Sequence, residues 1–155
     1  MKKVVPILFT AALLAVFPLT AAAQSKHGGH AGHGGKDAAH TEMLVLGLQT
    51  VAGVKAESHL EDVRAAMARM KMKETHHLMV LFVDEATGKP IEEGTAAVKI
   101  TDPAGKESDA IRLIAMDGHF GADLALAQRG KYLFRVGTRL PDGQTRQFEF
   151  SHTLK

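Results

Sequence analysis

The strongest constraint on the fold is a series of short segments in which apolar and polar residues alternate between turn residues. Residues 96–101 and 111–116 both alternate, and the second segment runs into Asp117-Gly118, a dipeptide typical of two-residue β-hairpins. Turn signals recur at intervals of roughly 8–12 residues, as they do in sandwich folds. We therefore predict an all-β chain, an immunoglobulin-like antiparallel β-sandwich of about seven strands.

Two segments in the first half of this domain have a different character. Residues 61–70 are rich in helix formers, and Val63, Met67 and Met70 recur at helical spacing. They predict a short helix with one apolar stripe. Residues 75–84 contain the uniformly apolar run 78–83, which predicts a central strand of the sheet.

The amino terminus has the layout of a secretory signal peptide. Lys2 and Lys3 precede an apolar run, and small residues at 21–23 offer a cleavage site. We expect residues 1–23 to be removed, which leaves a soluble exported protein without a membrane span. In a Gram-negative cell its location would be periplasmic. The chain has no cysteine, so we expect packing alone to hold the fold.

Composition argues against two classes of function. The signal contains two of the 19 Lys and Arg residues, which leaves 17 against 17 Asp and Glu. The mature chain is therefore near neutral and has no basic stripe, so we do not expect nucleic-acid binding. It has neither a cysteine nucleophile nor a nucleophile-elbow or phosphate-loop motif, so we do not expect an enzyme.

A Gly- and His-rich tail follows the signal over residues 24–42, before the folded metal-binding domain expected over 43–155. Short His-rich tracts are typical of metal binding, because neutral imidazole is the commonest metal ligand. The tail is expected to be flexible and to accept copper, zinc or nickel. A solvated linker without function is the alternative. The candidate ligands are His27, His30, His33 and His40.

Residues 67–79 contain four methionines and two histidines. Thioether sulfur suits Cu(I), and imidazole accepts several transition metals. Helix packing explains Met67 and Met70, which leaves Met72 freest to act as a ligand. His76 and His77 are adjacent, so on a regular strand they face opposite sides of the sheet, although a bulge would relax that rule.

A second group flanks the Asp117-Gly118 turn. Met116 and His119 stand directly opposite one another in a two-residue hairpin, with Cβ atoms about 5 Å apart. Both could therefore reach one ion, although a packed methionine beside an exposed turn histidine is the alternative. The predicted metal ligands of the folded domain are Met72, His76, His77, Met116 and His119.

Three runs resemble known families: Glu74 to Val80, Asp117 to Phe120, and Gly130 to Phe134. They are similar to YtkA-like or FixH-like domains, and the exported, cysteine-free chain resembles the small CopC-like periplasmic copper proteins. The resemblance implies binding and delivery of copper, with a protein metal donor or acceptor in the envelope, and not catalysis. The expected mature chain begins at Gln24 instead of a histidine, so an amino-terminal Cu(II) site is not carried over.

Two functions remain open from the sequence. The first is a copper chaperone or buffer in which Cu(I) is favoured. The second is an immunoglobulin-like interaction module, or an accessory subunit of an envelope complex, with its methionines in the core. Burial of Met72 and Met116 far from any histidine would favour the second function.

Overall fold

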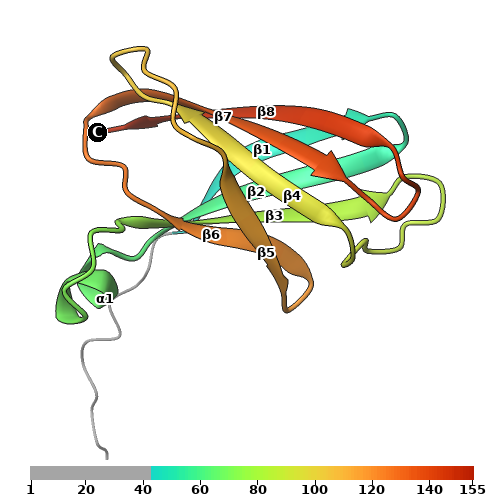
Figure 1. Cartoon of the computed structure of the whole chain (residues 1–155), viewed down its shortest axis with the longest axis horizontal. Coiled ribbons are helices and arrows are strands. Elements are labelled where there is room, and N and C mark those ends of the chain that lie inside the picture. The colour runs from blue at the N-terminus through green and yellow to red at the C-terminus, as the bar shows by residue number, and fades with distance from the viewer. Residues whose placement is uncertain (1–42) are drawn as a thin grey trace, which may run out of the picture. The chain divides into compact units, whose positions relative to one another are not determined.

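The computed structural model describes residues 43–155, which form eight antiparallel strands and one short helix (Figure 1). In chain order the elements are β1 (Met43–Val51), β2 (Val54–Asp62), α1 (Arg64–Arg69), β3 (His76–Asp84), β4 (Thr95–Thr101), β5 (Ile111–Met116), β6 (His119–Leu124), β7 (Gly130–Arg139) and β8 (Thr145–Leu154).

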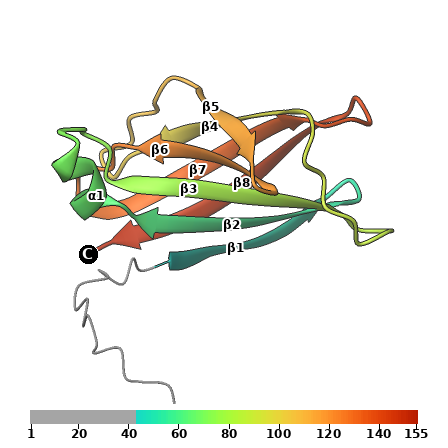
Figure 2. The same ribbon diagram turned by 90° about the horizontal axis from the view of Figure 1, so that it is seen from below.

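The strands pair in the order β1-β2-β3-β6-β5-β4-β7-β8. This ladder forms two layers, because β5 pairs with β6 on one side and with β4 on the other (Figures 1 and 2). The first and last strands also meet. The Gln49 side chain on β1 donates to the Glu149 carbonyl on β8 at 2.6 Å and accepts from its N–H at 2.9 Å. The predicted all-β antiparallel sandwich is confirmed, with eight strands and a nearly closed, barrel-like ladder.

Alternation along each strand builds the core between the layers. On β3 the inward side chains of Leu78, Val80 and Phe82 are almost completely buried. The Phe82 ring packs against Phe120 at a centroid distance of 5.3 Å and against Phe148 at 5.6 Å. Burial of one such side chain contributes about 1.5–3 kcal/mol, so packing can hold this cysteine-free domain.

The helix is shorter than the sequence predicts. Residues 61 and 62 continue β2, and α1 ends at Arg69. Met67 is buried, but Met70 lies beyond the helix and is 58% exposed. The predicted stripe is therefore wrong at Met70, because one short turn of helix buries only its central residue. Within residues 43–155, no helix is long and apolar enough to cross a membrane.

Candidate metal site on the outer face of the sheet

The two histidines that begin β3 lie on opposite faces of the sheet. His76 is 5% exposed and starts the inward series that continues with Leu78 and Val80. His77 alternates with these residues and lies on the outer face, as the strand period requires. The expected separation of the pair is confirmed, because β3 is regular at this point.

His77 is held in place by a carboxylate on the neighbouring strand. Asp123 on β6 is its cross-strand partner, and Asp123 Oδ1 lies 2.7 Å from His77 Nδ1. An imidazole that donates from Nδ1 to a carboxylate keeps its lone pair on Nε2. Metal-binding histidines are commonly oriented by such a partner, so Nε2 is the atom of His77 that could hold a metal.

Gly121 gives the His77 ring its space. Gly121 lies on β6, opposite Met79 on β3. A Cβ built on Gly121 would lie 2.7 Å from His77 Nε2. The ring therefore lies over the β6 backbone, where a larger residue would displace it. Its centroid is 6.1 Å from that of His119, and the two rings meet edge to face. The bare backbone at Gly121 brings two histidines from different strands together.

His119 reaches this point from the β5–β6 hairpin. Both turn residues have positive φ, 46° at Asp117 and 82° at Gly118, which is the geometry of a type I′ turn. Within the described chain, His119 Nε2 is a buried nitrogen without a hydrogen-bond partner. An unsatisfied buried polar atom is costly and calls for an explanation, and a role as a metal ligand would supply one.

Two methionines border the histidine pair. Met116 is the cross-strand partner of His119, as the turn predicts, and it is 46% exposed. Met79 lies two residues after His77, on the same outer face, and stands opposite Gly121. The outer face thus offers two imidazoles and two thioethers around Gly121.

The remaining predicted ligands lie elsewhere. Met72 is in the turn between α1 and β3, where its N–H bonds to the Met67 carbonyl at 2.9 Å, and it is 45% exposed. His76 faces the interior, so the structure does not bring it to the ion site of His77. The tail ligands His27, His30, His33 and His40 lie outside the described residues, as do the predicted signal and the tail over 24–42.

Sequence reasoning missed three contributors to this arrangement. Met79 could have been found from its spacing of two residues from His77, which places both on one face of a strand. Asp123 and Gly121 gave no local signal, because their role depends on the pairing of β3 with β6. His59 also faces outward across from Met79, and its Nε2 lies 3.0 Å from Glu57 Oε1.

The donor set favours a soft ion over a hard one. Thioethers and neutral imidazoles suit Cu(I), whereas harder cations prefer oxygen ligands. Within residues 43–155, no three His, Cys, Asp or Glu side chains gather in a geometry that could hold a metal. Among the described side chains, the thioethers of Met79 and Met116 are the candidates for coordination beyond the two histidines.

Comparison with known proteins identifies the fold alone. No family model matches the chain, and no curated protein matches it in sequence. Among solved structures, a DUF4426 family protein from Pseudomonas aeruginosa PAO1 is similar with a TM-score of 0.53 and 17% identity. The match covers 70% of this chain and 96% of that one. The resemblance to copper-handling families stays a prediction.

Proposed function

We propose that this protein is an exported copper-binding protein, a chaperone or buffer that holds Cu(I) on the outer face of its sheet. The observation that carries the proposal is the edge-to-face approach of the His77 and His119 rings, with His77 lying over Gly121. Asp123 orients the first ring, and the second has an unpartnered buried nitrogen.

The chemistry of the donors supports copper in particular. Two imidazoles and the thioethers of Met79 and Met116 are neutral, soft donors, and Cu(I) prefers such ligands. Neither ligand type is a thiolate, which an oxidising compartment would convert to a disulfide or a sulfur acid. A site of this kind fits the periplasmic location expected from the sequence.

The position of the site supports transfer. It lies on an open strand face, and Met116 is 46% exposed beside the hairpin turn. An ion held there can be reached by a protein partner in the envelope without any opening of the core. The His-rich sequence before the domain would supply further, less selective ligands for copper, zinc or nickel.

The rival function is an interaction module without a metal. Exposure of Met72 and Met116, and the pairing of Met116 with His119, support the copper proposal over it. One observation favours the rival: Val45 and Leu48 on β1 and Ile114 on β5 are also exposed, and exposed apolar side chains can mark protein contacts.

The direct test is titration of the mature protein with Cu(I) against a competing chelator. The variants are His119→Ala, Met116→Ala and a deletion of residues 24–42, with His152→Gln as the histidine control outside the site. We expect one tight equivalent that survives the deletion and the control. His119→Ala should weaken it more than about 100-fold, because ligand loss exceeds the 10–100-fold effect of an outer partner.

Two results would contradict this proposal. Binding that disappears with residues 24–42 would place the copper on the tail and leave the sheet without a site. Binding that is absent from every form of the protein would favour the interaction module.

A further inference from the structure

A separate pocket lies at one end of the sandwich, and His76 is one of the residues that line it. It has a volume of ≈ 420 Å³ and is bounded by the starts of β1 and β3, the ends of β2 and β8, and the connection between β6 and β7. Apolar side chains in its lining are Leu44, Leu126 and Leu154. The mouths of β-barrels and sandwiches are common sites for small ligands.

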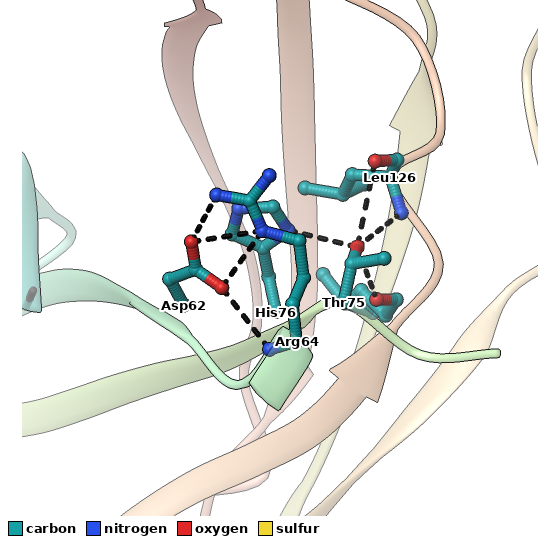
Figure 3. Close-up of polar contacts among 6 residues, drawn as sticks. Asp62, Arg64, Thr75, His76 and Leu126 are labelled. Atoms are coloured by element: carbon teal, nitrogen blue, oxygen red, sulfur yellow. Dashed lines mark hydrogen bonds and ion pairs between the residues drawn. The ribbon is translucent and has the colours of Figure 1, made fainter. Parts of the chain in front are cut away.

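His76 is fixed in the wall of this pocket (Figure 3). Its Nδ1 lies 2.9 Å from the Thr75 hydroxyl, which accepts the Leu126 N–H at 2.9 Å and lies 3.3 Å from the Leu124 carbonyl. When the Thr75 hydroxyl donates to Nδ1, the neutral ring carries its hydrogen on Nε2. That Nε2–H can then donate to a ligand.

Positive charge dominates the side chains that line the pocket. Arg64 on α1, Arg129 in the β6–β7 connection and Lys155 after β8 line the pocket, against one carboxylate, Asp62. Arg64 holds Asp62 through both carboxylate oxygens and lowers the pKa of that acid. Asp62 is therefore occupied as a partner, which leaves Arg129 and Lys155 as cations for an anionic ligand.

We propose that this pocket binds a small organic carboxylate. The carboxylate would meet Arg129, Lys155 and the His76 ring, and its apolar chain would lie against the leucines. A metal is a poorer occupant, because Asp62 is engaged by Arg64. The inference does not rest on copper binding, because His77 and His119 lie on the other face of the sheet.

The test is an NMR titration of the mature protein with hexanoate, followed at the backbone amides of His76 and Leu126. Hexanol and inorganic phosphate serve as the uncharged and purely ionic probes. We expect saturable shifts with hexanoate only. The double variant Arg129→Gln, Lys155→Gln should weaken binding about tenfold, because charge-assisted hydrogen bonds are lost. Arg139→Gln, at the opposite end of β7, is the control and should change nothing.

His76→Gln provides an independent check. It should weaken hexanoate binding, because the shorter Gln side chain does not reach as far as the Nε2–H of His76, whereas the Cu(I) affinity stays unchanged. Three results would overturn the inference: no saturable shift with hexanoate, equal binding of hexanol, or binding that is unaffected by the double variant. Equal binding of phosphate would also overturn the claim that the ligand is organic, because the apolar chain would then add nothing to binding.

Discussion

His76 and His77 are neighbours in the chain and occupy opposite environments. His76 is buried at one end of the sandwich, where the Thr75 hydroxyl holds its ring and Arg129 and Lys155 line the same pocket. His77 lies on the outer face, where Asp123 orients it and Gly121 makes room for its ring. Two consecutive residues of one strand thus carry the ring proposed to meet an anion, His76, and the ring proposed to hold a metal, His77.

The difference teaches that a pair of histidines in sequence is weak evidence for a shared site. On a regular strand, the partners of each ring come from other strands of the sheet. His77 gains its partners from β6, whereas His76 gains its own from the β6–β7 connection. Substitutions that affect one ring and spare the other test whether the two histidines act independently.

Among changes to the residues that position the two rings, Gly121→Ala should have the largest effect. A Cβ at 2.7 Å from His77 Nε2 must displace the ring, so we expect about a 100-fold loss of Cu(I) affinity, the upper end for a residue that orients a ligand. Gly137→Ala is the matched control, because its Cβ would meet nothing within 4 Å. Equal Cu(I) affinities of the two variants in a chelator competition would show that the His77 position is irrelevant.

Thr75→Val should affect only the surroundings of His76, and not the candidate metal site. Loss of the hydroxyl leaves the buried Leu126 N–H without its acceptor, so we expect about 1–3 kcal/mol lower free energy of unfolding in urea. The Cu(I) affinity should change by less than about twofold. Loss of a residue that orients a metal ligand typically costs 10–100-fold, but Thr75 holds His76 and not His77. Thr145→Val, on the exposed start of β8, is the control. A large loss of copper binding would mean that the two regions are coupled.

Asp123→Asn should weaken copper binding by about tenfold, because removal of the carboxylate behind a ligating histidine typically costs 10–100-fold. Asn can still accept from Nδ1, so the ring keeps its direction and the loss falls at the low end. Asp62→Asn, beside His76, should leave the Cu(I) affinity unchanged. The reverse pattern would place the copper at the inner pocket.

Stability should also depend on pH through His76, with the smallest effect. Burial lowers its pKa in the folded state, so the unfolded chain takes up the proton first as the pH falls below about 6.5. The contribution of the neutral ring is complete above that pH and is lost as the pH falls through the folded pKa. Urea unfolding from pH 7.5 to pH 5 should show a shallower decline for His76→Gln than for the unchanged protein.

Local patterns predicted much of the fold and half of the site. Alternation and the Asp117-Gly118 turn were sufficient for the sandwich, for the split between His76 and His77, and for the pairing of Met116 with His119. The contact between His77 and His119 depends on how β3 pairs with β6, and these two histidines are more than 40 positions apart in sequence. No local pattern encodes such a register, which also explains why Gly121 and Asp123 were missed.

The predicted helix was overextended for a similar reason. Helix-forming residues begin at 61, but pairing of Glu61 and Asp62 with β3 keeps them in a strand. Tertiary pairing outweighs intrinsic propensity there, and only six residues remain for α1.

The most direct test of the central claim is ¹⁵N NMR of the histidine side chains before and after one equivalent of Cu(I). Cu(I) is diamagnetic, so each ring nitrogen remains observable. The account predicts that the Nε2 signals of His77 and His119 shift together and that those of His76 stay in place. A shift of His76, or of neither outer-face histidine, would contradict it.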